Sequence, residues 1–148
     1  MRVFVDTNVL LRYVNPDDPA HPVIVAALDR LLFGGHEIGF TPQVCREFWN
    51  VATRPRSANG FGLEPELVNQ LVTDISKTLD FWDDEPGIAM EWRKIVVELK
   101  VKGVQVHDAN HAAAALWHGA THVLTLDQDD FDRYSQFGLI PISPSLLT

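Results

Sequence analysis

Short apolar runs alternate with longer amphipathic segments along the whole chain. Residues 2–6 (RVFVD) are apolar and rich in β-branched side chains, which is typical of a buried strand. Residues 21–33 instead carry apolar side chains at helical spacing on one side. The pattern predicts strands at 2–6, 37–40, 79–82, 122–126 and 139–142, and helices at 8–14, 21–33, 42–54, 66–79, 87–101, 107–119 and 129–136. Because short strands alternate with helices from end to end, we expect a parallel sheet covered on both faces.

Turn residues separate these segments. Gly34-Gly35 ends one helix, and Thr41-Pro42 starts another, with the hydroxyl as a cap and proline at the first helical position. Residues 56–65 (RSANGFGLEP) contain turn residues throughout and predict the longest loop, a surface loop around Gly-Phe-Gly. With 148 residues and no internal repeat, the chain is expected to form one domain over residues 1–148.

The charge of the chain bears on its partners. The formal net charge is −8, opposite in sign to the basic footprint that phosphate contact normally leaves. A site that holds divalent cations must itself be rich in carboxylates, however, and a small basic patch can exist on an acidic protein. Arg46, Arg54 and Arg56 lie close together in the sequence and are the candidates for phosphate contact.

No feature of the sequence indicates export or a membrane. The single cysteine, Cys45, cannot form an internal disulfide, and in the apolar stretch VCREFWNVA we expect it to be a small core residue. The first residues lack the cleavage pattern of a signal peptide, and no apolar run approaches the roughly 20 residues that cross a bilayer. We therefore expect a cytoplasmic protein without membrane association.

Four carboxylates stand at positions where a doubly wound sheet would bring them together. Asp6 follows the strand RVFV, Asp127 follows HVLTL, and Glu47 and Asp108 lie in or at predicted helices. In such a sheet these groups can converge at the carboxyl ends of the strands. Carboxylates gathered in one cleft resist ionisation, and Mg²⁺ or Mn²⁺ relieves this repulsion because these ions take oxygen ligands. The four acids together predict a metal site.

Each acid also has a purely structural interpretation. Asp6 and Asp108 could cap the helices that follow them, and Asp127 in LDQDD could do the same. Glu47 shares a polar stripe with Gln43 and could lie on an ordinary solvated helix face. The prediction of a metal site therefore depends on the spacing of the acids across the whole chain.

Two other chemistries are compatible with parts of the sequence. The segment His107 to His111 resembles the zinc motif H-E-x-x-H with aspartate in place of glutamate, and the two imidazoles would share a helix face. No third ligand is evident, so exposed or capping roles are expected for both histidines. A signalling domain with a phosphorylated aspartate would need a lysine on a late strand, and no lysine follows Lys102.

Three segments resemble the PIN domain family, in particular the VapC-type toxins of toxin–antitoxin pairs. MRVFVDTNVLLRYV resembles the opening strand with its Asp-Thr-Asn signature, and TPQVCREFWNVATRP resembles the helix that supplies the second acid. VHDANHAAAALWHGATHVLTLDQDDF resembles the closing segment with the third and fourth acids. The resemblance covers essentially the whole chain. It implies an α/β/α sandwich with a central parallel sheet of about five strands.

The resemblance also implies a divalent-metal-dependent endoribonuclease that uses Mg²⁺ or Mn²⁺ to hydrolyse phosphodiester bonds in RNA. Position by position, the family's metal-site acids match Asp6, Glu47, Asp108 and Asp127. Thr7 and Asn8 match the polar residues that support the first acid, and Thr125 matches a position near the fourth. In LDQDDF, Asp129 or Asp130 could replace Asp127 or support it from outside.

The implied partners are an RNA substrate, a VapB-like antitoxin and a second copy of the chain in a homodimer. Arg46, Arg54 and Arg56 are then the expected RNA contacts. Two alternatives stay open: a PIN fold that acts as a catalytically weak protein-binding or regulatory module, and a zinc hydrolase that uses His107 and His111.

Overall fold

A computed structural model describes residues 1–148 and contains a sheet in which all neighbouring strands are parallel. The strands are β1 (Arg2–Val5), β2 (Glu37–Phe40), β3 (Asp80–Phe81), β4 (His122–Leu124) and β5 (Ile140–Ile142). Their order in space is β3-β2-β1-β4-β5, so β1 is the central strand. In the register, Phe4 lies between Gly39 of β2 and Val123 of β4.

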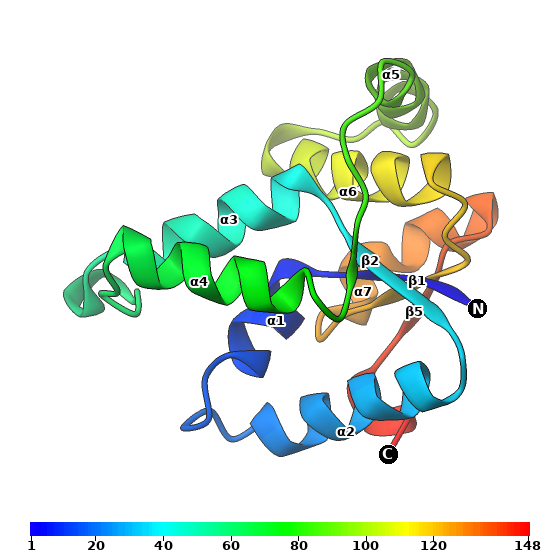
Figure 1. Ribbon diagram of the computed structural model, residues 1–148. Coiled ribbons are helices and arrows are strands. Elements are labelled where there is room, and N and C mark those ends of the chain that lie inside the picture. Colours follow the sequence, from blue (N-terminus) through cyan, green and yellow to red (C-terminus); the bar gives the residue numbers. More distant parts are fainter.

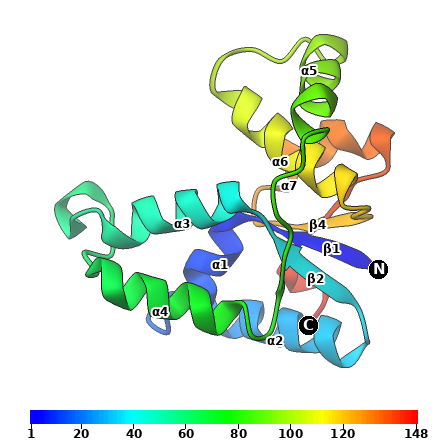
Figure 2. The ribbon, with the colours of Figure 1, turned by 45° about the horizontal axis from the view of Figure 1, so that its top comes forward.

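Helices cover both faces of this sheet. They are α1 (Thr7–Tyr13), α2 (His21–Phe33), α3 (Pro42–Thr53), α4 (Pro65–Ile75), α5 (Ile88–Glu98), α6 (Val106–Trp117) and α7 (Gln128–Asp132). In both ribbon views, α2 lies on one side of the sheet and α6 on the other, with α5 outside α6 (Figures 1 and 2). The pair α3 and α4 runs side by side and projects away from the sheet (Figure 1). This arrangement is the predicted α/β/α sandwich. A helix both long and apolar enough to span a membrane is not among the seven.

All predicted strands and helices are present, with shifted ends. The two largest differences concern the helices predicted at 66–79 and 129–136: α4 ends at Ile75, with turns at residues 76–78, and α7 ends at Asp132, followed by a 3₁₀ helix (Arg133–Phe137). The strand predicted at 79–82 keeps only two paired residues at the sheet edge. Leu79 and Trp82, which flank this strand, are buried, so the apolar pattern extends beyond the paired residues.

The central strand and α6 form the middle of the core. Val3, Phe4 and Val5 of β1 are fully buried, which explains the continuous apolar run of this strand. The alanines of α6, Ala109 and those at 112–115, are also buried. Their small side chains allow close packing of α6 against its neighbours, among which α5 makes the most extensive contact.

The segment predicted as a long surface loop is folded back on the end of α3. It begins with a 3₁₀ turn (Arg56–Ala58) and continues with backbone hydrogen bonds from Phe61 N to Val51 O (3.0 Å) and from Leu63 N to Ala52 O (2.9 Å). The segment is therefore held against α3 by its backbone hydrogen bonds.

The prediction that Cys45 lies in the core was wrong. On α3 its side chain is only partly buried, because the core face of the helix is formed by Val44, Phe48 and Ala52.

Trp82 lies flat against a glycine of β2. A Cβ atom built on Gly39 would come within 2.1 Å of the Trp82 ring. The indole also stacks on His118, at 5.7 Å between ring centroids, and the guanidinium of Arg2 lies 5.0 Å from the ring centroid. Gly39 thus leaves the space in which this aromatic cluster packs.

Candidate active site

The strand order reverses direction at β1 and β4, and the acids lie at this point. From β1 the chain adds β2 and β3 on one side, whereas β4 and β5 lie on the other side. Asp6 follows β1 directly, and its backbone N–H donates to Leu124 O at the end of β4 (3.0 Å). In open parallel sheets, ligands bind in the crevice at such a switch point, outside the carboxyl ends of the strands.

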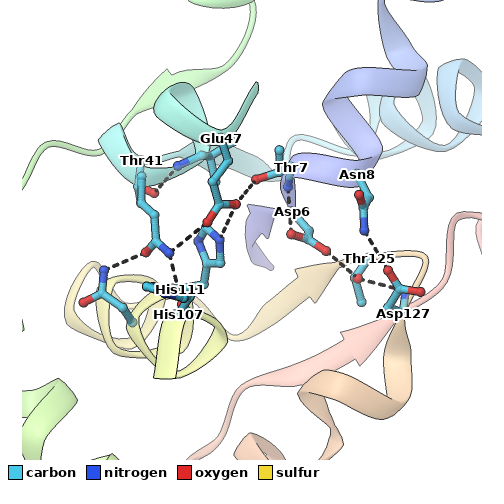
Figure 3. Close-up of polar contacts among 12 residues, drawn as sticks. Asp6, Thr7, Asn8, Thr41, Glu47, His107, His111, Thr125 and Asp127 are labelled. Carbon is cyan, nitrogen blue, oxygen red and sulfur yellow. Dashed lines mark hydrogen bonds and ion pairs between the residues drawn. The ribbon is translucent and has the colours of Figure 1, made fainter. Parts of the chain in front are cut away.

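The four predicted acids line one pocket of about 270 Å³, called here the acid pocket. Its lining residues are Asp6, Thr7, Asn8, Leu11, Glu47, Asn50, Val51, Asp108, His111, Asp127, Asp130 and Phe131. The side chains come from β1–α1, α3, α6 and the segment after β4, so residues near both ends of the chain meet here (Figure 3). The pocket contains no lysine or arginine.

Asp6 is both a helix cap and part of the pocket wall. Its Oδ1 accepts from the backbone N–H of Thr7 (2.7 Å) at the start of α1, and its Oδ2 accepts from the Thr125 hydroxyl (2.8 Å). Burial, reinforced by the negative charge of Glu47, raises the pKa of Asp6 above its ordinary value, although His111 and the two hydrogen bonds oppose this. A buried carboxylate in this state is stabilised by a nearby cation.

Asp108 is the freest of the four carboxylates. It lies in the first turn of α6 and is not the N-cap, a position held by Gln105, so the capping interpretation was wrong for this residue. Its side chain accepts no hydrogen bond from the protein. Burial raises its pKa, His111 opposes the shift, and the charges of Asp6, Asp130 and Glu47 add to it.

Glu47 is held by three hydrogen bonds. Its Oε2 accepts from the Thr7 hydroxyl (2.7 Å) and from His111 Nε2 (2.9 Å), and its Oε1 accepts from Gln43 Nε2 (3.0 Å) (Figure 3). Burial raises the pKa of Glu47, but the hydrogen bond and charge of His111, together with the other two hydrogen bonds, lower it from 4.5 to about 2. Glu47 therefore belongs to a bonded network and not to a plain solvated face.

His111 was not recognised as a site residue from the sequence. It was expected to be exposed or capping, yet it is only 2% exposed, whereas His107 is exposed as expected. The available signal was its place among the alanines of a buried helix face, where an imidazole needs a polar partner from another element. The partner, Glu47, is 64 positions away in the sequence.

The structure distinguishes the acids of LDQDDF. Asp127 Oδ2 accepts from the Asn8 side-chain amide (2.7 Å), and the backbone N–H of Asp127 donates to the Thr125 hydroxyl (3.0 Å). Asp130 also lines the acid pocket, but Asp129 does not. Asp127 is thus connected to Asp6 through the Thr125 hydroxyl, and Asp130 is an additional negative charge nearby.

The three arginines have different surroundings. Arg46 is 68% exposed and lies 3.9 Å from the Asp84 carboxylate. Arg54 donates to the Asn59 carbonyl (3.2 Å) and so supports the folded-back segment after α3. Arg56 lines a separate hollow of about 330 Å³ with Asn15, Phe61 and other residues.

The donor set fits a magnesium-like ion better than zinc. No three His, Cys, Asp or Glu side chains are grouped closely enough to hold one ion together. Protein-bound Zn²⁺ takes at least three such ligands, whereas Mg²⁺ is held by one or two carboxylates and keeps several waters. Asp6 and Asp108, whose carboxylates keep free lone pairs, meet the second requirement. His111, bonded to Glu47, is not available to pair with His107.

Comparison with known proteins agrees with this geometry. The family model of the PIN domain matches residues 3–136, and the chain therefore belongs to the PIN domain family. Comparison with curated protein sequences gives no match.

Solved structures with the same fold have low sequence identity to this chain. VapBC2 from Rickettsia felis, bound to a DNA fragment from its promoter, has a TM-score of 0.71 at 16% identity, over 97% of this chain and 98% of that chain. VapC20 from Mycobacterium tuberculosis, a toxin that cleaves the sarcin–ricin loop, has a TM-score of 0.64 at 16% identity, over 93% and 96%. FitAcB from Neisseria gonorrhoeae has a TM-score of 0.64 at 20% identity, over 96% and 97%. The chain is thus a PIN domain with the fold of VapC toxin structures.

Proposed function

We propose that this protein is a divalent-metal-dependent endoribonuclease that hydrolyses phosphodiester bonds in RNA, and that it is the toxin of a toxin–antitoxin pair. The observation that carries the proposal is the convergence of Asp6, Glu47, Asp108 and Asp127 on one pocket at the carboxyl edge of the sheet. Membership of the PIN domain family and the shared fold with an RNA-cleaving toxin support the same function.

The hydrogen bonds suggest a division of roles among the acids. Asp108 accepts no hydrogen bond and Asp6 accepts two, so both have free lone pairs with which to hold Mg²⁺ or Mn²⁺. Glu47 and Asp127, which are held by neighbouring side chains, would bind a second ion or orient water. A bound ion supplies a water of lowered pKa and neutralises charge on the phosphodiester oxygens. Thr125 and Asn8 keep Asp6 and Asp127 in place.

Removal of divalent ions tests the proposal. With a fluorescently labelled single-stranded RNA, we expect cleavage in Mg²⁺ or Mn²⁺ and loss of cleavage in EDTA, because no lysine or arginine lines the pocket to replace the metal. Cleavage that persists in EDTA would refute the metal-dependent mechanism. Restoration by Zn²⁺ alone would instead favour the zinc alternative at His107 and His111.

A hollow next to the acid pocket offers a path for the RNA strand. Leu11 of α1 lines the acid pocket, and Val14, the C-cap of the same helix, lines the hollow that contains Arg56. Across from α1, Val51 of the acid pocket accepts a backbone hydrogen bond from Phe61 of the hollow. The two hollows therefore lie next to each other along α1 and α3, and under this proposal a strand cleaved at the acids would pass Arg56.

Replacement of Arg56 by alanine is expected to weaken RNA binding about fivefold at 0.1 M salt. One phosphate contact on a single strand contributes about 0.7 to the slope of log affinity against log salt concentration, which amounts to about fivefold between 1 M and 0.1 M salt. The measurement is KM or Kd over a series of salt concentrations. The slope of log affinity against log salt concentration should become shallower by about 0.7, the contribution of one phosphate contact. Arg93→Ala on the outer helix α5 is the matched control. Equal effects of the two variants would exclude a specific contact at Arg56.

The partners are proposed on the family resemblance. A VapB-like antitoxin and a homodimer are expected, and a cytoplasmic location remains a prediction. Sequencing of the gene immediately upstream, followed by co-expression of its product with this chain, tests the antitoxin. A protein that binds such a partner but leaves RNA intact with Mn²⁺ would correspond to the alternative of a catalytically weak binding module.

A further inference from the structure

One buried polar group near the acids is not explained by the metal site itself. His111 lies on the alanine-rich face of α6, 2% exposed, with its ring 5.5 Å from that of Phe4 between centroids. An imidazole among apolar neighbours is costly unless it is hydrogen-bonded. Its Nε2 is 2.9 Å from Glu47 Oε2, whereas its Nδ1 is buried without a partner. Since the ionised Glu47 carboxylate can only accept, Nε2 carries the proton and donates it.

The hydrogen bond from His111 is one of three that hold the Glu47 carboxylate, and these three bonds are called here the clamp. An ionised carboxylate offers about four lone-pair positions. His111, Thr7 and Gln43 occupy three of those on Glu47, at 2.9, 2.7 and 3.0 Å. Gln43 is itself fixed by the Asn110 side-chain amide (2.6 Å) and donates to the His107 carbonyl (3.1 Å). Helix α6 therefore holds Glu47 of α3 both directly and through Gln43.

We propose that His111 is a positioning residue of the acid pocket: its buried Nε2–H fixes the Glu47 carboxylate so that a single lone pair remains for a ligand or water in the pocket. This inference rests on the proposed function for its catalytic consequence. Asp6 and Asp108, which keep more free lone pairs, are not held in this way. His111 contributes by restricting the orientation of Glu47, because at 2% exposure it has almost no surface with which to contact a substrate.

The test separates a positioning role from simple packing. Leucine at 111 fills much of the same space but cannot donate, whereas glutamine carries an amide N–H that can. We expect His111→Leu to lower kcat for RNA cleavage 10–100-fold with little change in KM, as is usual for residues that orient metal-site groups. His111→Gln should recover most of the loss. In a Glu47→Ala background, His111→Leu should have no further effect, because its partner is absent.

Equal losses in the leucine and glutamine variants, or additive losses of Glu47→Ala and His111→Leu, would overturn the proposal. Long-range ¹H–¹⁵N spectra of the wild-type protein provide a readout that does not depend on activity or on the folding of variants. A His111 ring protonated at Nε2 supports the clamp, and a ring protonated only at Nδ1 overturns it. If the wild type cleaves no RNA with Mn²⁺, the proposed function fails, while the spectra still decide whether His111 holds Glu47.

Discussion

Replacement of Asp6 by asparagine is expected to abolish most RNA cleavage, with a loss of more than about 100-fold, because even residues that only support a metal ligand contribute 10–100-fold. Asparagine is nearly isosteric. Its Oδ1 can still accept from Thr7 N, and its amide can donate to the Thr125 hydroxyl in place of the present bond. The loss would therefore reflect the missing charge and not a lost helix cap.

The same substitution should stabilise the metal-free fold at neutral pH. Burial raises the pKa of Asp6 above the ordinary 3.8, so its contribution to stability is complete below pH 3.8 and is lost as the pH rises through the raised pKa. Asparagine has no charge to bury and escapes this loss. We expect the Tm of Asp6→Asn to exceed that of the wild type by a margin that widens from pH 4 toward pH 7, in EDTA.

Thermal unfolding and cleavage assays on the same preparations check both parts. Asp132→Asn, an exposed acid at the end of α7, is the control and should leave cleavage and Tm nearly unchanged. Added Mn²⁺ should raise the Tm of the wild type more than that of Asp6→Asn, because only the wild type retains the full site. Undiminished cleavage by Asp6→Asn would remove the mechanism. A lower Tm at pH 7 would contradict the role of burial.

Gly39→Ala is expected to destabilise the protein by about 1–3 kcal/mol, equivalent to a fall in Tm of roughly 2–12 °C. The backbone at Gly39 is not in the left-handed region, so alanine alone would give a gain of about 0.4–1 kcal/mol through the unfolded state. The added Cβ, however, would lie 2.1 Å from the buried Trp82 ring. The steric conflict is the larger effect and decides the sign.

A double-mutant cycle identifies the cause. In a Trp82→Leu background the conflict is relieved, and Gly39→Ala should become neutral or mildly stabilising. Chemical denaturation of the four proteins gives the coupling free energy. Cleavage per folded molecule should not change, since neither residue lines the acid pocket. Equal destabilisation in both backgrounds would show that the Trp82 contact is not responsible.

The sequence was sufficient for the layers of the fold. Alternation of apolar strands with amphipathic helices predicted the parallel sheet and its covering, because burial on one or both faces leaves a periodic trace in each segment. It also placed Asp6 and Asp127 at strand ends, since a residue that follows a buried strand in such a sheet must lie at the edge where ligands bind. Element ends such as that of α4 were less certain, because apolar residues continue past the last hydrogen bond.

Contacts between distant segments were decided only by the tertiary structure. The pattern marks which face of a helix is buried, but not which side chain meets it. The pairing of His111 with Glu47 depends on how α6 lies against α3, and that of Asn8 with Asp127 on how β1 and β4 align. A buried polar group must find its hydrogen-bond partner wherever packing places one. For this reason the sequence could name the acids, whereas only the folded chain showed which of them are held and which are free.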